Sequence, residues 1–252
     1  MTPAFLKLVW VEFRRHWTVT ALIVPLLFLV IGSLMVFFPG PFNKTFNVGE
    51  KLYQLMVLLV PFTSAFFCVG LVSNDVKDGW LRTLLVRAIR REEYLLAKSL
   101  SALTSIWVAI LFASTLPLIV GLIFMKLPIE FQVGEVLALY ALFFCVSLLY
   151  VSILVFFSCW LPGVVNVVAL MGWGIIAGAL HAYVTFSLWD SSWAVFTEQF
   201  LFPSGFFDAV DAVRAQTHTP YTEIAWGMAA LAFFSSLSFW SVNRIQVDKG
   251  SE

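Results

Sequence analysis

Long apolar stretches alternate with short polar segments along the whole chain, and this alternation is its most regular feature. A helix needs about 20 apolar residues to cross the ~30 Å hydrocarbon core of a bilayer, because each residue adds about 1.5 Å. Six stretches reach that length. The pattern predicts an all-α membrane protein, a single transmembrane domain over residues 1–252, with six transmembrane helices over residues 18–38, 53–72, 99–124, 136–157, 164–182 and 224–242.

The amino-acid composition agrees with this class. Hydrophobic residues make up 61% of the 252 residues and charged residues only 12%, about half the roughly 25% of an average soluble domain. So few polar side chains cannot cover a water-soluble globule. The net charge is zero, so no excess positive charge attracts a polyanion. The composition therefore excludes a soluble enzyme and a nucleic-acid-binding domain.

The distribution of Lys and Arg predicts the orientation. Six spans place both termini on one side of the membrane. If that side is the cytoplasm, the inner segments hold three, six and two Lys or Arg in chain order, whereas the outer segments together hold four. Because cytoplasmic loops carry the excess of positive residues, we expect both termini to be cytoplasmic.

The predicted spans contain almost no ionisable side chains. His181 is the only one, whereas ion-coupled transporters and intramembrane enzymes usually keep several such groups inside the bilayer. The chain also lacks a GxxxxGK[ST] motif, so it has no P-loop with which to bind ATP. Its three Cys show no metal-ligand spacing. If the protein moves a cargo, we expect the energy to come from a partner.

The segment before the first span is amphipathic. Five apolar residues share one helical face: Leu6, Val9, Trp10, Phe13 and Trp17. Glu12, Arg14 and Arg15 lie mostly off that face. The pattern favours an interfacial helix over residues 4–17, lying in the inner headgroup plane. The alternative is an irregular start of the first span.

The cytoplasmic segment between spans two and three, residues 74–98, is the most informative one. Its apolar residues follow a helical period and form a stripe: Leu81, Leu84, Leu85, Ala88 and Ile89. Arginines surround the stripe, and Asp75 and Asp78 precede it, where a helix N-terminus favours anions. Such a helix suits docking to a soluble partner. Spacing alone does not distinguish this from a loop whose arginines only fix the topology.

The outer segment between spans five and six, residues 186–210, is too aromatic for a loop in water. Trp193 lies in its first half, and a Pro203–Gly205 turn precedes Phe206. A re-entrant pair of short helices fits, because their backbone polar groups stay internally bonded. An aromatic belt lying flat on the membrane surface is the alternative.

Two glycines of span five, Gly174 and Gly178, have the GxxxG spacing that permits close helix packing. That packing would be either within the chain or against a second copy.

Segment 74–98 resembles the cytoplasmic signature of the type-2 ABC exporter permeases. The residues that carry the resemblance are Asp78-Gly79, Leu84-Leu85, Arg90-Arg91 and Lys98. Ala88 and Ile89 depart from it, because the family often has Pro and a small residue there. The layout is also similar, with an interfacial N-terminal helix, six spans, this loop and an apolar segment before the last span.

The resemblance implies that the segment is a coupling helix on which a separate cytoplasmic ATPase docks. The docking residues would be Asp78, Gly79, Leu81, Leu84, Leu85, Arg87, Ile89, Arg90 and Arg91. Lys98 would open the third span, where its side chain is expected to reach toward the interface. The resemblance also implies the re-entrant outer helices.

A complete exporter of this kind has two permease chains, identical or paralogous, and two ATPase subunits that bind ATP and Mg. This chain itself would hold no cofactor or metal and catalyse no reaction. We expect a multi-pass protein of the plasma (inner) membrane of a prokaryote, with an amphipathic or lipid-like cargo. A non-transporting membrane scaffold and an intramembrane enzyme are the alternatives.

Overall fold

A computed structural model of the protein describes residues 3–17, 26–27, 29–33, 46–81, 89–124, 129–187, 205–215 and 219–244, and these are mostly helical. The helices are α1 (Pro3–His16), α3 (Val48–Cys68), α4 (Ser73–Lys77), α6 (Arg91–Phe124), α7 (Val133–Trp160), α8 (Val165–Ser187), α10 (Gly205–Ala215) and α11 (Tyr221–Arg244). Two short strands, β1 (Phe46–Asn47) and β2 (Ile129–Glu130), complete the described elements.

Four described stretches are long and apolar enough to cross a bilayer: Val48–Lys77, which joins α3 and α4, Arg91–Ile123 in α6, α7 and α11. The predicted helical fold is thereby confirmed, and these four stretches have the length and composition of membrane-spanning helices. Helix α8 covers the expected fifth span with a shorter apolar stretch, Val165–Leu180. Most of the expected first span lies outside the described residues. Within it the structure describes residues 26–27 and 29–33, and these are helical. The count of six remains a prediction.

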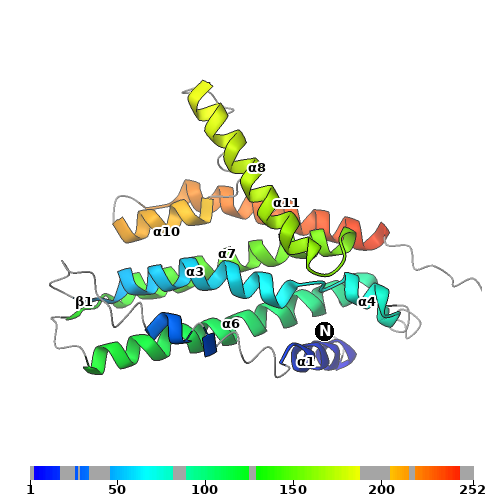
Figure 1. Ribbon diagram of the computed structural model, residues 1–252, viewed down its shortest axis with the longest axis horizontal. Coiled ribbons are helices and arrows are strands. Elements are labelled where there is room, and N and C mark those ends of the chain that lie inside the picture. The colour runs from blue at the N-terminus through cyan, green and yellow to red at the C-terminus, as the bar shows by residue number, and fades with distance from the viewer. Residues whose placement is uncertain are drawn as a thin grey trace, which may run out of the picture.

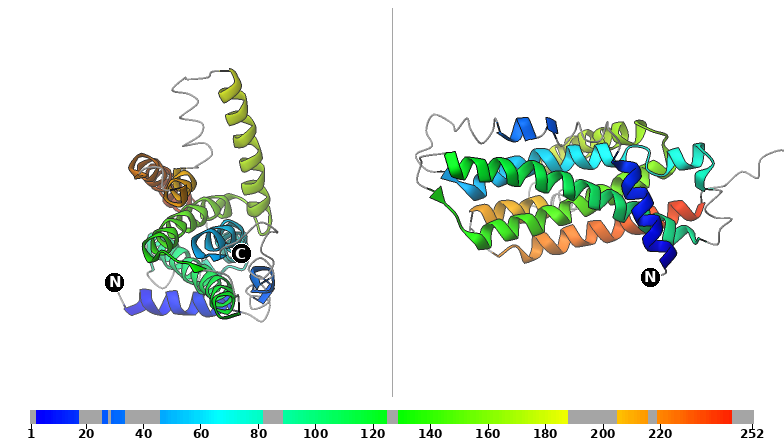
Figure 2. Two further views of the ribbon diagram at one scale, coloured as in Figure 1. Left: turned by 90° about the vertical axis from the view of Figure 1, so that its left-hand side faces the viewer. Right: turned by 90° about the horizontal axis from the view of Figure 1, so that it is seen from below.

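The long helices form a bundle with α7 at its centre. Helices α3, α6, α7 and α11 run along the long axis of the molecule (Figure 1), and α7 packs against α3, α11, α10 and α6. Its buried residues lie on several sides of the helix, since Leu149 and Val151 are two residues apart and so point in nearly opposite directions, as expected for a helix that is apolar all round. Helix α8 contacts α7 but projects away from the bundle, and α1 lies across it (Figures 1 and 2).

Two ends of the bundle differ in construction. At one end β1 pairs with β2 in parallel, matching Phe46 with Ile129 and Asn47 with Glu130. The Asn47 side chain also accepts a hydrogen bond from the Glu50 amide, 3.0 Å away, and so caps α3. Strands of two residues leave no periodic signal in a sequence, so these two were not predicted. The opposite end, which we call the α4 end, carries α4, α1 and the start of α6 (Figure 1).

Helix α6 begins eight residues earlier than the predicted span. The backbone amide of Arg90 donates to the Glu93 carboxylate at 3.4 Å, which is the reciprocal half of a helix-capping arrangement. The helix therefore starts at Arg91 and not near Ser99. The last part of the predicted coupling segment, including Lys98, is thus a rigid extension of a membrane-length helix.

Helix α10 supplies the described part of the predicted re-entrant segment. Gly205 opens the helix, and Phe206 is fully buried between α7 and α11. Trp193 and Pro203 lie outside the described residues. The helix continues to Ala215, beyond the predicted end of the re-entrant segment at residue 210.

Phe206 packs directly on the backbone of Gly227 in α11. A Cβ atom built on Gly227 would lie 2.5 Å from the Phe206 ring carbon Cδ1. No methyl group fits at that distance, and the buried ring has no free space into which it could move. The absence of a side chain at Gly227 is therefore what lets α10 lie against α11.

We predict that Gly227→Ala destabilises the protein although alanine favours a helix over glycine. Overpacking of this kind costs about 1–3 kcal/mol, which outweighs the propensity gain of about 1 kcal/mol. The measurement is the thermal unfolding midpoint of the purified protein in detergent. Gly134→Ala is the control, because nothing lies within 4 Å of its Cβ position. An equal or raised midpoint for Gly227→Ala would contradict this packing.

Candidate functional site

Four charged side chains and one tyrosine meet at the α4 end of the bundle, and we call them the charge network: Glu12, Arg15, Asp75, Tyr94 and Lys98. They come from α1, α4 and the start of α6, which are far apart in the sequence. Glu12, Asp75 and Lys98 are each at most 3% exposed. Three buried charges in so small a volume make this the most unusual feature of the described residues.

The register of α1 brings Glu12 into the protein. Phe5 and Leu8 are buried, and Glu12 follows them on the same side of the helix at i+7 and i+4. The apolar face expected to lie against the interface includes Leu6 and Trp10, which are exposed. Helix α1 therefore has two apolar sides, one packed against α6 and one open, and Glu12 belongs to the packed side.

Lys98 is the centre of the network. Its Nζ lies 2.6 Å from Glu12 Oε2 and 2.7 Å from Asp75 Oδ2. Tyr94, one helical turn earlier on α6, donates its hydroxyl proton to Asp75 Oδ2 at 2.8 Å. One ammonium group thus joins α1 to α4, and both are held on α6.

Arg15 completes the network on the exposed side. Its guanidinium donates to Asp75 Oδ1 at 2.7 Å and lies 3.8 Å from Asp78 Oδ2. Asp75 therefore accepts from both sides, through one oxygen from α1 and through the other from α6. The carboxylates of Glu12 and Asp75 balance the buried ammonium of Lys98 and the half-exposed guanidinium of Arg15, so the charges alternate in sign and sum to zero.

Alternation of sign is what allows these groups to be buried. An ion loses several kcal/mol on leaving water, and only a close partner of opposite sign with good geometry recovers it. Each buried charge here has such a partner within 2.7 Å. The arrangement is consequently sensitive, because removal of one charge leaves another buried without its partner.

Neutral side chains hold the backbone at the same end. Ser158 of α7 accepts hydrogen bonds from the amides of Val72 and Ser73, at 2.9 and 3.3 Å. Asn166 of α8 donates to the carbonyl of Cys68 at 2.9 Å. These bonds satisfy backbone groups that the end of α3 and the start of α4 leave without helical partners. The turn between α3 and α4 is thereby fixed to α7 and α8.

The predicted docking residues fall in three places. Leu84, Leu85 and Arg87 lie outside the described residues. Asp78, Gly79 and Arg90 are exposed, and Gly79 has φ +70°, a left-handed conformation that glycine adopts without strain. Leu81 is 3% exposed within the core, and Ile89 packs against that core. Leu81 therefore stabilises the fold from inside and does not offer a surface to a partner.

Arg91 stabilises the fold of this chain. Its guanidinium donates to the carbonyl of Asn243 at 2.7 Å and to that of Val242 at 3.4 Å. These carbonyls belong to the last turn of α11, where a cation also opposes the negative end of the helix dipole. The start of α6 is thus tied to the end of α11.

The expectation for Lys98 was wrong. The sequence suggested a lysine that reaches toward the membrane interface, but the structure buries its ammonium group between two carboxylates. Glu12 was also missed, since it was grouped with the polar side of α1. Its position one turn after Leu8, and the i, i+4 spacing of Tyr94 and Lys98, are the signals that could have indicated both.

The GxxxG glycines of α8 make no close contact with the part of the chain that the structure describes. Neither Gly174 nor Gly178 has a described atom within 4 Å of its Cβ position. Neighbouring residues on α8 are open too, with Ile175 and Ile176 73% and 66% exposed. Packing of this glycine pair against another helix of the same chain is not observed among the described residues.

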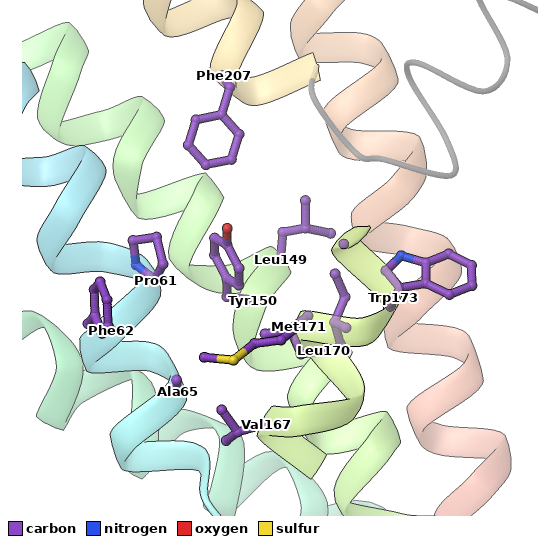
Figure 3. A pocket seen from close by; sticks show the side chains of 12 residues that line it. Pro61, Phe62, Ala65, Leu149, Tyr150, Val167, Leu170, Met171, Trp173 and Phe207 are labelled. Atoms are coloured by element: carbon purple, nitrogen blue, oxygen red, sulfur yellow. The ribbon is translucent and has the colours of Figure 1, made fainter. Parts of the chain in front are cut away.

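An apolar pocket of about 260 Å³ lies between α3, α7, α8 and α10. Figure 3 shows Pro61 and Ala65 of α3 on one side, Met171 of α8 opposite, and Tyr150 of α7 and Phe207 of α10 at the remaining sides. Almost all of its lining is hydrocarbon, so it suits an apolar chain or ring.

No protein-family model matches this chain, and no curated protein matches it. Within the described parts of the chain, no group of three or more His, Cys, Asp or Glu is placed to hold a metal ion. The structure defines a mostly helical protein with four apolar stretches of membrane-spanning length and a buried charge network at one end of its bundle.

We predict that Lys98→Met destabilises the protein by about 3–5 kcal/mol, because it leaves two buried carboxylates with one guanidinium. The double variant Lys98→Met/Glu12→Gln should regain part of this loss, since it restores the balance between Asp75 and Arg15. Unfolding midpoints of the two single variants and the double variant measure the coupling. Lys77→Met, on an exposed part of α4, is the control. Strict additivity of the two changes would contradict the network.

Proposed function

We propose that this chain is the membrane-spanning permease subunit of an ATP-driven ABC exporter. It would form half of a translocation pathway and couple to a separate cytoplasmic ATPase. The layout of the sequence and the motif around Asp78-Gly79 support this function. The observation that carries it is the charge network, because it lies beside the segment expected to receive the ATPase.

The network explains how a push on that segment would reach the bundle. The segment between α4 and α6 starts next to Asp75 and Asp78 and ends at Arg91. Lys98 and Tyr94 fix Asp75 to α6, and Arg15 fixes it to α1. Movement of the segment would therefore shift α1, α4 and the start of α6 together. Closure of the ATPases on nucleotide would tilt these helices and alternate the access of the pathway.

A second permease chain would lie against α8. This helix contacts its own chain mainly through α7 and lines the apolar pocket with Gly174. Gly178 has no described atom near its Cβ position, and Ile175 and Ile176 are exposed. Small residues without close neighbours allow another helix to approach. Whether the partner is identical or paralogous, it would pack on this side of α8.

The apolar pocket beside α8 supports an amphipathic or lipid-like cargo. Its volume of about 260 Å³ is slightly below the ~300–1,000 Å³ of pockets that enclose whole small ligands. One chain would thus accommodate a single acyl chain or ring, and the remainder of the cargo would lie against the second chain.

The decisive experiment is purification of the tagged protein from its native membrane, followed by identification of its partners. We expect a P-loop ATPase in equal amount and ATP hydrolysis in the complex. Leu84→Asp should abolish that association, because burying a leucine contributes about 1.5–3 kcal/mol and a carboxylate opposes it. Arg87→Ala should have a smaller effect, since exposed charge pairs contribute under about 1 kcal/mol.

Insertion of the Leu84→Asp variant in the membrane at the normal level is the necessary control. An intact complex in that variant would mean that the segment does not dock the ATPase. Absence of any ATPase from the wild-type preparation would reject the exporter and favour a scaffold or an intramembrane enzyme.

The proposed orientation has its own test. A reporter that is active only outside the cytoplasm should be active when fused after Lys44 or Arg214. The same reporter should be silent after Arg87 or at the C-terminus, because the excess of Lys and Arg holds those segments inside. The reverse pattern would place the docking segment on the wrong side for a cytoplasmic ATPase.

A further inference from the structure

A polar pocket of about 230 Å³ opens beside the charge network. Helix α1 contributes Glu12, Arg15 and His16 to its wall, the end of α3 contributes Phe66, and α4 contributes Asn74. The pocket is separate from the apolar one described above and shares none of its lining residues. Asp75 and Lys98 line it as well, so its wall carries two carboxylates, one ammonium paired with both of them, one imidazole, and one guanidinium at the rim.

Glu12 contributes to this pocket a carboxylate oxygen that accepts no hydrogen bond from the described residues. One of its oxygens, Oε2, lies 2.6 Å from Lys98 Nζ. The other, Oε1, has no hydrogen-bond partner among the described residues, although the side chain is only 1% exposed. A buried polar atom left in this way costs about 1–3 kcal/mol, and more when it is charged. A ligand that donates a proton to Oε1 would recover that loss.

His16 provides a second acceptor. Its Nδ1 lies 2.8 Å from the backbone carbonyl of Glu12. A carbonyl only accepts, so Nδ1 carries the proton and Nε2 carries a lone pair. Burial, and after it the nearby charge of Lys98, lower the pKa of His16 below its usual value. The neutral imidazole is therefore the form present near pH 7, and Nε2 can accept a hydrogen bond.

Arg15 adds a cation at the mouth of the pocket. Its side chain is 45% exposed; Nη1 lies 2.7 Å from Asp75 Oδ1, and Nη2 lies 3.8 Å from Asp78 Oδ2. A guanidinium has five N–H donors in a planar fork, and such a fork binds phosphate oxygens well. Donors for a phosphate thus lie next to acceptors for an ammonium.

The surroundings of the pocket indicate a lipid. On α1, Leu6 and Trp10 are 58% and 59% exposed, and Phe66 at the pocket wall is 37% exposed. A helix with Trp and cations at the end of a transmembrane bundle lies at headgroup depth. An acyl chain can follow these apolar residues while its headgroup enters the pocket.

We propose that this pocket binds the headgroup of an aminophospholipid from the adjoining leaflet. The primary ammonium donates to Glu12 Oε1 and His16 Nε2, and the phosphate accepts from Arg15. A choline headgroup has no N–H and cannot make the first two bonds. The bound lipid would fasten α1 to the membrane at the point where the charge network fastens it to α4 and α6. This requires only that α1 lies at the membrane surface, and so it does not depend on ATP-driven transport.

The test keeps the protein unchanged and removes donors from the lipid. The full-length protein is placed in nanodiscs that contain phosphatidylethanolamine, its N-monomethyl or N,N-dimethyl derivative, or phosphatidylcholine, all with the same acyl chains. The lipid molecules that stay bound when the protein is released from the nanodisc are counted by native mass spectrometry. We expect one tightly held phosphatidylethanolamine and a stepwise loss with methylation, reaching at least about tenfold weaker retention for phosphatidylcholine. Equal retention across the series would overturn the proposal.

Two further ligands separate the possible sources of this chemistry. Phosphatidylglycerol offers the phosphate without the ammonium and should be retained weakly; retention equal to phosphatidylethanolamine would mean a phosphate site and reject the assignment to Glu12. Soluble glycerophosphoethanolamine offers the headgroup without acyl chains and should compete poorly. Competition as strong as that of the lipid would reject the membrane source.

A pair of variants on α1 locates the site. His16→Leu removes the Nε2 acceptor and should reduce the preference for phosphatidylethanolamine over phosphatidylcholine by severalfold. Arg14→Gln, an exposed neighbour on the same helix, should leave that preference unchanged. An unfolding midpoint measured for each variant separates loss of lipid from loss of fold. An unaltered preference in a folded His16→Leu protein would show that the lipid binds elsewhere.

Discussion

A single ammonium group between two carboxylates determines how the α4 end of this protein is built. Lys98 can be buried only because Glu12 and Asp75 both lie within 2.7 Å of it, and Glu12 is buried only because Lys98 is there. Asp75 is held by Lys98, Arg15 and Tyr94 together. Moving either α1 or α4 would leave a buried charge without its partner. Apolar packing from residues such as Phe5 and Leu8 brings α1 close, but contacts of that kind have no direction and would tolerate several orientations. The ion pairs select one of them.

The two ends of the bundle are therefore held by different kinds of interaction. At the α4 end, directional bonds connect every described neighbour: the charge network joins α1, α4 and α6, Ser158 and Asn166 fix the turn after α3, and Arg91 holds the end of α11. At the opposite end, a ladder of two residue pairs and the packing of Phe206 on Gly227 hold the chain. The helices of the α4 end are joined by these bonds and therefore move as a unit. A segment that receives force from a partner requires such an end.

The outer part of the bundle has the opposite character. Helix α8 is held by few neighbours in its own chain, and its glycines and isoleucines are open. The exposed apolar surface of such a helix, and the pocket along one side of it, are covered by apolar groups of lipid, of a second chain or of a cargo. The same molecule thus combines a rigid polar end with an apolar side that has room for partners.

The sequence by itself determined the class of protein and the course of its main helices, because the length of an apolar stretch and the shortage of charges depend only on which residues follow one another. Helices α3, α6, α7, α8 and α11 each overlap an expected span. Only the tertiary structure decided what the polar residues near the helix ends do. Glu12, Asp75 and Lys98 are ordinary interfacial residues in a linear sequence, and their meaning comes from being brought together from three helices. The same reason explains why Leu81 and Arg91, expected to face a partner, instead stabilise the fold: burial depends on how neighbouring helices pack, and a stripe along one helix does not say which of its sides that packing will cover.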